Sequence, residues 1–155
     1  MGLGLARLGA ASVCLTDLEA KGELMKRNVL ANAVGECKCE VHPLAWEDGW
    51  EEASPLVATR AKSGGFDWIV ASDCVYGRAS SVPFANVLLA LLRANPVSAV
   101  LLAYEERPLP PTEVNQGSSF FELMAEEGCD LVRVDGEELG GDVRAQISLW
   151  RGRLR

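Results

Sequence analysis

The sequence of 155 residues contains one histidine, and aromatic residues make up only 6% of the chain. The single histidine, His42, does not support a histidine general base or a metal cluster, so we expect it to be an ordinary strand residue. The cysteines also lack the paired spacing of a zinc site, so no resident metal is expected. They are Cys14, Cys37, Cys39, Cys74 and Cys129.

Basic residues are scarce relative to acidic ones: 15 lysines and arginines stand against 22 aspartates and glutamates, a formal net charge of −7. Nucleic acids and anionic membranes recruit clusters of lysine and arginine, so we expect neither as a partner. No apolar segment is long enough to span a bilayer. A cationic substrate, such as a lysine-rich segment of another protein, is easier to accommodate.

The cysteine count is odd, and most cysteines lie in apolar runs that are typical of buried strands. Reduced, buried thiols are therefore expected. This favours an intracellular location, cytoplasmic with the nucleus as an alternative. The apolar residues 1–11 could suggest a signal peptide, but their run is interrupted at Gly9 and leads directly into a strand that ends at Asp17.

With 48% hydrophobic residues, the chain has enough apolar side chains for one globular domain over residues 1–155. Short apolar runs predict strands near residues 12–17, 38–43, 66–72, 98–104, 130–135 and 145–151. Segments of helical character lie between them, so the expected fold class is α/β with a largely parallel sheet. Such folds bind ligands at the carboxyl ends of their strands.

Two of the predicted helices carry start signals. Pro83 occupies a position typical of a first helical residue, and apolar residues at helical spacing follow it as far as Asn95. Ser119 and Glu122 have the spacing of a capping box for a helix that ends near Gly128. The proline-stiffened residues 107–116 are predicted to form the one long loop.

Side chains able to bind a ligand follow several predicted strands. Asp17 ends the first strand and precedes a helix, where a carboxylate can accept hydrogen bonds from both hydroxyls of a ribose. A helix N-cap explains an aspartate there equally well. Trp46 follows the second strand, where its indole suits either an adenine face or a partly buried place in the core.

Asp73 and Tyr76 follow the third strand. An acid and a phenol three residues apart can both reach the mouth of the sheet, and a structural turn explains the acid alone better than it explains the pair. Charged residues 105–107 follow Tyr104 at the end of the fourth strand in the same way. Four consecutive strand ends therefore carry side chains that can contact a ligand.

The order of short motifs along the chain identifies a family. The motifs are L-G-A at 8–10, L-T-D-L at 15–18, Asn28 and Asn32, L-A-W at 44–46, F-D at 66–67, S-D-C-V-Y at 72–76, E-R at 106–107 and F-F at 120–121. In this order they resemble the eukaryotic protein lysine methyltransferases of methyltransferase family 16, over essentially the whole chain. The D-x-x-Y element, with L-x-W, E-R and F-F, separates this family from other nucleotide-binding α/β folds.

The resemblance implies a Rossmann-like, seven-β-strand methyltransferase sheet, mostly parallel with an antiparallel last strand, and S-adenosylmethionine as the cofactor. By position, Asp17 would hold the ribose of the cofactor, Trp46 would pack near its adenine, and Ser72 would lie against it. Asp73 and Tyr76 would border the methyl-transfer channel as the catalytic residues. Many relatives carry an acid where this chain has Ala45.

Relatives begin the fold with a strand that ends in a glycine-rich loop, E-x-G-x-G-x-G, whereas this sequence starts at about the last glycine of that loop. Gly2 and Gly4 correspond to the helix side of the loop. The resemblance therefore implies that the first, central strand is missing, with the backbone N–H groups that contact the cofactor. Without that strand the chain is expected to be marginally stable.

The function expected from the resemblance is methyl transfer from S-adenosylmethionine to a lysine side chain of a protein substrate, by a monomer. A catalytically inactive fragment or pseudoenzyme that binds a partner protein is the main alternative. A methyltransferase acting on a small molecule or RNA is less favoured. A nicotinamide-dependent dehydrogenase is poorly supported, because the sequence has no complete G-x-G-x-x-G motif.

Overall fold

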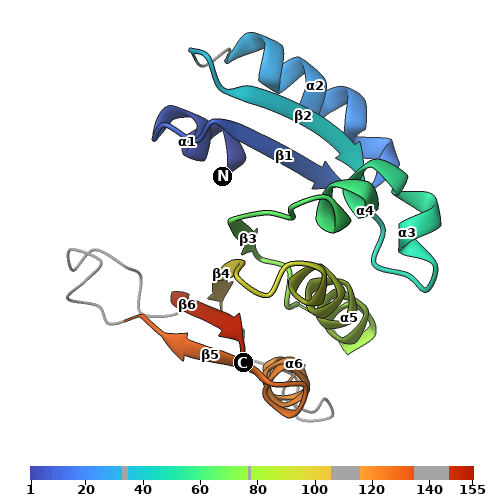
Figure 1. Cartoon of the computed structure of the whole chain (residues 1–155), viewed down its shortest axis with the longest axis vertical. Helices are drawn as coiled ribbons and strands as arrows, with labels where there is room; N and C mark the ends of the chain where they lie inside the picture. Colours follow the sequence, from blue (N-terminus) through green and yellow to red (C-terminus); the bar gives the residue numbers. More distant parts are fainter. Residues whose placement is uncertain (33–34, 77, 106–115, 135–146) are drawn as a thin grey trace. The chain divides into compact units, whose positions relative to one another are not determined.

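The computed structural model describes residues 1–32, 35–76, 78–105, 116–134 and 147–155. The chain divides into two compact units, Met1–Thr59 and Arg60–Arg155. Figure 1 labels the helices and strands of both.

The first unit is built on a two-stranded parallel ladder. β1 (Ser12–Asp17) pairs with β2 (Lys38–Pro43) along the whole length of both strands. The 3₁₀ turn η1 (Glu19–Lys21) and α2 (Gly22–Ala31) connect them, and Figure 1 shows α2 running along the ladder. Parallel neighbours need such a crossover connection. Both strands have the bounds predicted from the sequence.

A short helix, α1 (Gly2–Arg7), precedes β1 and packs against it. A Cβ atom on Gly2 would lie 2.2 Å from Cδ2 of Leu15 and 3.2 Å from Cγ1 of Val13, whereas one on Gly4 would meet nothing within 4 Å. Glycine at position 2 therefore lets the helix approach the strand closely. This is one of the packing roles that glycine has in nucleotide-binding folds.

Two further helices follow β2: α3 (Trp50–Ala53) and α4 (Pro55–Lys62). The hydroxyl of Ser54, between them, donates a hydrogen bond of 2.7 Å to the carbonyl of Pro43 at the end of β2. Trp50 is buried. These contacts hold the helical segment at the carboxyl end of the ladder.

The second unit contains a four-stranded sheet in the order β3-β4-β6-β5. Its strands are β3 (Trp68–Ser72), β4 (Ala99–Glu105), β5 (Cys129–Arg133) and β6 (Ile147–Leu154). β3 and β4 are parallel, and β6 is antiparallel to both of its neighbours. The mixed, mostly parallel sheet and the antiparallel last strand agree with the predicted Rossmann-like fold class.

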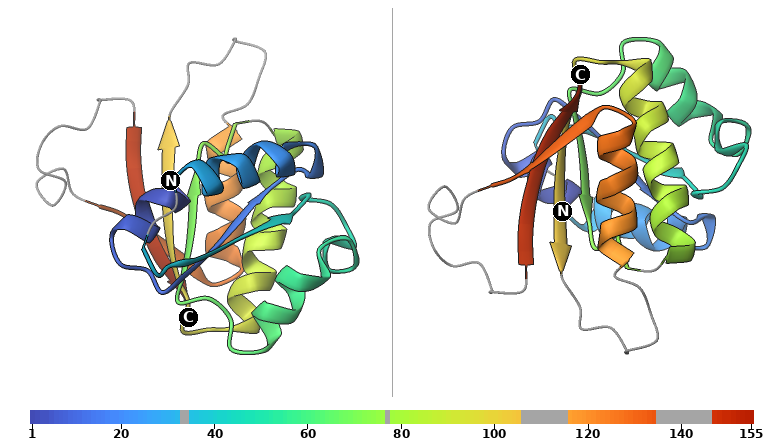
Figure 2. Two further views of the ribbon diagram at one scale, coloured as in Figure 1. Left: turned by 90° about the horizontal axis from the view of Figure 1, so that it is seen from above. Right: turned by 90° about the horizontal axis from the view of Figure 1, so that it is seen from below.

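Helices α5 (Arg78–Ala94) and α6 (Gln116–Glu126) lie side by side against one face of this sheet (Figure 2). The rings of Phe84 and Phe120 stack between them, 5.6 Å apart. Other fully buried side chains of this core are Leu88, Leu92, Val100, Leu102 and Met124. Leu101 and Ala103 of β4 are only half-buried, because the described helices of this unit cover one face of the sheet.

The predicted starts of both helices were wrong. α5 begins at Arg78, so Pro83 lies inside it, and α6 begins at Gln116, so Ser119 lies inside the helix and not at its cap. A proline near the start of a helix removes few backbone hydrogen bonds, and burial of the apolar face of the helix outweighs that loss. The predicted end of α6 near Gly128 is confirmed by the φ of 82° at that residue.

A glycine turn positions the start of β3. Gly64 and Gly65 have φ angles of 123° and 71°. The side-chain amide of Asn95 donates a 3.0 Å hydrogen bond to the carbonyl of Gly64. A Cβ atom on Gly65 would lie 2.3 Å from the Cβ of Asn95. Glycine is therefore required by both the backbone conformation and the close approach.

The cysteines depart from expectation in their burial. None of the five forms a disulfide, but only Cys129 is buried, and the other four are partly exposed. Among the described residues, β1 pairs only with β2, and β3 pairs only with β4. A two-stranded ladder covers its side chains poorly, which explains the exposure of the thiols that it carries. Within the described ranges no helix is long and apolar enough to cross a membrane.

Candidate functional site

Asp17 lies at the carboxyl end of the β1–β2 ladder. The amide of Leu44 donates a 2.9 Å hydrogen bond to the carbonyl of Asp17, which extends the ladder by one residue beyond β2. The carboxylate of Asp17 is exposed and accepts a 2.7 Å hydrogen bond from the amide of Leu18. An accessible carboxylate therefore lies at the carboxyl end of the ladder, where α/β folds bind their ligands.

The alternative role of Asp17 as a helix cap is not supported. Leu18 occupies the N-cap position of η1, and Lys21 occupies that of α2. Neither helix start has a side-chain capping hydrogen bond. Since capping requires a side-chain oxygen to accept an N–H group of the first turn, Asp17 caps neither helix.

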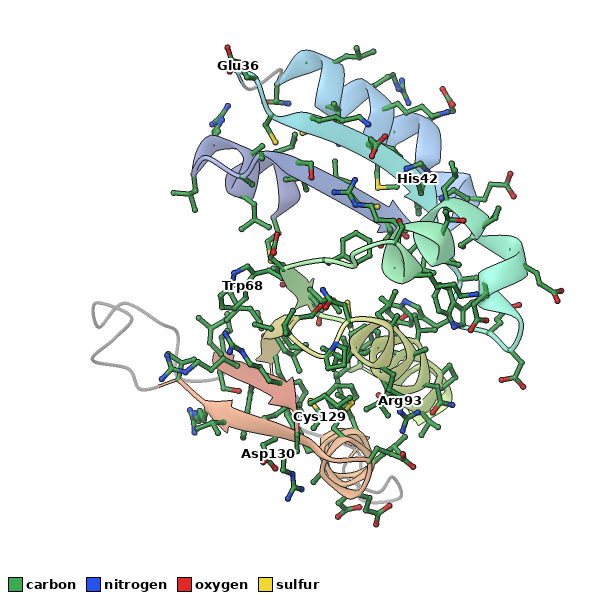
Figure 3. All side chains as sticks on the ribbon, in the orientation of Figure 1. Glu36, His42, Trp68, Arg93, Cys129 and Asp130 are labelled. Atoms are coloured by element: carbon green, nitrogen blue, oxygen red, sulfur yellow. The ribbon has the colours of Figure 1, made fainter. Side chains whose placement is uncertain are left out.

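Trp46 lies two residues beyond Leu44, at the same end of the ladder as Asp17. Leu44 is buried, whereas Ala45 and Trp46 are half-buried. A half-buried indole keeps one part of its surface available, which fits a stacking role and a partial core role equally. His42, at this end of β2 (Figure 3), is paired with Thr16 and is a strand residue, as expected.

Ser72 and Asp73 lie where β3 ends. Ser72 is exposed and is in register with Ala103 of β4. Asp73 follows with its amide 3.1 Å from the carbonyl of Ala103 and with a φ of 56°. Among the described residues it is the only non-glycine residue with a positive φ. Such backbone conformations cost free energy and concentrate at functional sites.

Tyr76 lies in the same short connection between β3 and α5. Its side chain is 54% exposed, as is typical of a surface group, whereas Val75 beside it is buried. The thiol of Cys74 is 3.5 Å from the carbonyl of Ser72. Val75 therefore anchors this connection in the core, and the exposed Asp73 and Tyr76 lie on either side of it.

The predicted site residues fall into two groups. Asp17 and Trp46 lie at the carboxyl end of the ladder in the first unit. Ser72, Asp73 and Tyr76 lie at the carboxyl end of β3 in the second unit. The structure brings the members of each group to one strand end.

The aromatic motif that follows β4 has a structural role. Phe121 contacts Tyr104 edge-to-face at 5.7 Å and lies 4.5 Å from the ring of Trp150. Phe120 has no exposed surface. This aromatic cluster was not predicted from the sequence, although the paired phenylalanines at 120–121 gave a signal for it. Glu106 and Arg107 lie outside the described residues.

The described part of the chain contains no group of three or more metal ligands, and its one buried thiol is not a nucleophile. Burial, with a smaller contribution from the charge of Asp130, raises the pKa of Cys129 to about 11. Cys129 is therefore a protonated core residue and not a nucleophile.

Comparison with known proteins gives one result. A search of curated proteins found no match. A family model described as lysine methyltransferase matches residues 1–127, which include β1 to β4 and both groups of candidate site residues. Because this match spans most of the sequence, the chain belongs to the lysine methyltransferase family, as the order of its motifs predicted.

Proposed function

We propose that this protein transfers a methyl group from S-adenosylmethionine to a lysine side chain of a protein substrate. Membership of the lysine methyltransferase family implies S-adenosylmethionine-dependent methyl transfer. The observation that carries the finer assignment is the backbone of Asp73, which is left-handed directly after a strand and presents an exposed carboxylate. A functional role for the acid of the D-x-x-Y element would explain why its backbone is strained.

Asp17, Trp46 and Ser72 are the residues proposed to hold the cofactor. The exposed carboxylate of Asp17 can accept charge-assisted hydrogen bonds from two ribose hydroxyls. The half-buried indole of Trp46 can cover an adenine face, and the exposed Ser72 can contact the cofactor from the end of β3. S-adenosylmethionine, when bound, supplies an electrophilic methyl group on a sulfonium.

Asp73 and Tyr76 are the residues proposed to act on the substrate. In-line methyl transfer depends mainly on aligning a neutral amine. With a lysine pKa of about 10.4, forming that amine near neutral pH costs roughly 4 kcal/mol. A carboxylate close to the amine would raise this cost, so we assign Asp73 to capturing and orienting the incoming ammonium. Tyr76 would form the wall of the channel.

A glycine-rich strand is proposed to complete the cofactor site. Among the described residues, β1 and β3 each pair with a single strand, so each has an edge whose N–H and C=O groups are not used in a ladder. Such edges readily accept another strand. The loop after that strand would provide the backbone N–H groups that the cofactor's methionine and ribose portions need.

The test uses the chain extended at its N-terminus by such a strand and loop. The wild-type protein and the Asp73→Asn and Tyr76→Phe variants are incubated with cell extract and labelled S-adenosylmethionine, and mass spectrometry locates the label. We expect label on protein lysine, with turnover reduced far more than cofactor affinity in both variants. Label on RNA or a metabolite would overturn the protein-lysine assignment. Full labelling by Asp73→Asn would remove Asp73 from the mechanism.

The two strand edges also favour the second candidate, a protein-binding module without catalysis. A sheet edge that lacks a partner can bind a strand of another protein. Calorimetric titration of the 155-residue chain with S-adenosylhomocysteine separates the two functions. Binding by the 155-residue chain, or by the extended chain alone, supports a cofactor pocket and favours the methyltransferase. No binding by either chain favours the protein-binding module.

A further inference from the structure

Two cysteines lie side by side at the start of β2, at the end of the strand opposite to Asp17 and Trp46. The thiol of Cys39 is 3.9 Å from the Sγ atom of Cys37, and both side chains are partly exposed. In Figure 3, the labelled Glu36, which precedes Cys37, marks this end of β2, and His42 marks the other. The pair is therefore accessible and separate from the candidate methyl-transfer residues.

The backbone sets the two thiols on the same side of the chain. Cys37 directly precedes β2 and Cys39 is the second residue of the strand, where alternate side chains lie on opposite faces. Lys38, between the cysteines, points to the other side, where its Nζ atom is 3.0 Å from Oε1 of Glu40. The amide of Lys38 donates a 3.0 Å hydrogen bond to the carbonyl of Ala11. Hydrogen bonds of the ladder thus hold the segment that carries both thiols.

The separation of the sulfurs fits an ion bound between them. Two sulfurs 3.9 Å apart can both contact one ion, because two metal–sulfur bonds of about 2.3 Å span up to about 4.6 Å. A disulfide would instead require the sulfurs to approach to about 2.05 Å. That approach would pull on the backbone at Lys38, where the ladder begins. Chelation needs no such movement, so the geometry favours a bound ion over a disulfide.

The number of ligands limits which ion can bind. No third histidine, cysteine or carboxylate completes a metal-binding group in the part of the chain that the structure describes. Zn²⁺ in structural sites takes four protein ligands, so two thiolates hold it weakly. Thiolates are soft ligands and therefore prefer soft cations such as Cu(I). A pair of thiolates therefore favours a soft cation over Zn²⁺.

We propose that Cys37 and Cys39 form a two-thiolate site for a soft monovalent cation of the Cu(I) class. Binding forms two metal–sulfur bonds and releases two protons to solvent, with no change of oxidation state. Because binding displaces two protons, affinity falls as the pH decreases, by up to about a hundredfold per pH unit.

The experiment titrates the 155-residue chain with Cu(I), in the absence of oxygen, against a chromophoric Cu(I) chelator. We expect one tightly bound ion per chain. Cys37→Ser and Cys39→Ser should each weaken binding by about a hundredfold or more, because each leaves a single thiolate. Cys14→Ser and Cys74→Ser, which remove partly exposed thiols elsewhere, should retain the wild-type affinity. Circular dichroism checks that every variant is folded.

Two further measurements make the result decisive. X-ray absorption of the Cu(I) complex should show two sulfur neighbours, and Zn²⁺ in the same titration should bind more weakly. Equal loss of affinity in Cys74→Ser, or unchanged affinity in folded Cys37→Ser and Cys39→Ser, would overturn the site. Tighter binding of Zn²⁺ would overturn its selectivity. Since ion stoichiometry is the readout, none of these outcomes bears on methyl transfer.

Discussion

The amide of Asp73 donates a 3.1 Å hydrogen bond to the carbonyl of Ala103, and this bond holds Asp73 in a left-handed conformation with a φ of 56°. Ser72 is already in register with Ala103, so the contact lies at the point where the chain leaves the sheet. A rigid strand therefore maintains the unusual backbone of a candidate catalytic residue. Aspartate tolerates this conformation better than most residues do.

Alanine is usually more stabilising than glycine, but the left-handed backbone of Asp73 predicts the reverse order at this position. Asp73→Gly should be more stable than Asp73→Ala by about 1 kcal/mol, because a Cβ atom is penalised at positive φ. At Ser72, which has no positive φ, Ser72→Ala should be at least as stable as Ser72→Gly. Urea unfolding of the four variants measures these differences. If Asp73→Ala is the more stable of its pair, the left-handed conformation is not maintained in solution.

The strands could be predicted because their signal is local. Apolar runs bounded by polar or glycine residues gave β1 and β2 their observed bounds and placed the other four within three residues at each end. Helix starts depended on more than sequence. Pro83 and Ser119 have strong local preferences for helix starts, but packing in the second unit extends each helix upstream of them.

In the candidate site, too, features with a local sequence signal were predictable and those that depend on distant contacts were not. Asp17, Asp73 and Tyr76 were predicted as site residues because charge and a phenol follow apolar strands directly. The backbone conformation of Asp73 had no signal in the sequence, since it depends on the hydrogen bond to Ala103 in a distant strand. The paired thiols of Cys37 and Cys39 were missed because their separation is set by the ladder, and the burial expected for them assumed a larger sheet.

Asp17 is predicted to matter for the cofactor and little for folding. In the chain extended by the glycine-rich strand, Asp17→Ala should weaken S-adenosylmethionine binding by one to two orders of magnitude, because charge-assisted hydrogen bonds worth roughly 1.5–3 kcal/mol are lost. Calorimetry measures the affinity. The free energy of unfolding should change by less than about 0.5 kcal/mol, since Asp17 caps neither helix. Unchanged affinity with lower stability would return Asp17 to a structural role.

Phe120 is predicted to be essential for the second unit. It has no exposed surface and stacks on Phe84 of the neighbouring helix. Phe120→Ala should lower the free energy of unfolding by about 3–5 kcal/mol, enough to unfold a marginally stable chain. Glu122→Ala, an exposed position in the same helix, serves as the control and should change stability by less than about 0.5 kcal/mol. Similar thermal melts for the two variants would contradict the observed core.

Cys129 is predicted to make stability depend on pH in the alkaline range. Burial raises its pKa to about 11 in the folded protein, whereas an unfolded cysteine titrates near about 8.5. Between these values the unfolded chain has lost the thiol proton and the folded chain still holds it. The contribution of Cys129 is therefore fully present below pH of about 8.5 and is lost as the pH rises to about 11.

The measurement is urea unfolding of the wild type and of Cys129→Ala at several pH values across this range. Other groups titrate here in both proteins, so the informative quantity is the difference between their free energies of unfolding. We expect the advantage of the wild type over Cys129→Ala to decrease as the pH rises. A constant difference would mean that the thiol is exposed to water in the folded state, because only a desolvated thiol resists ionisation at these pH values.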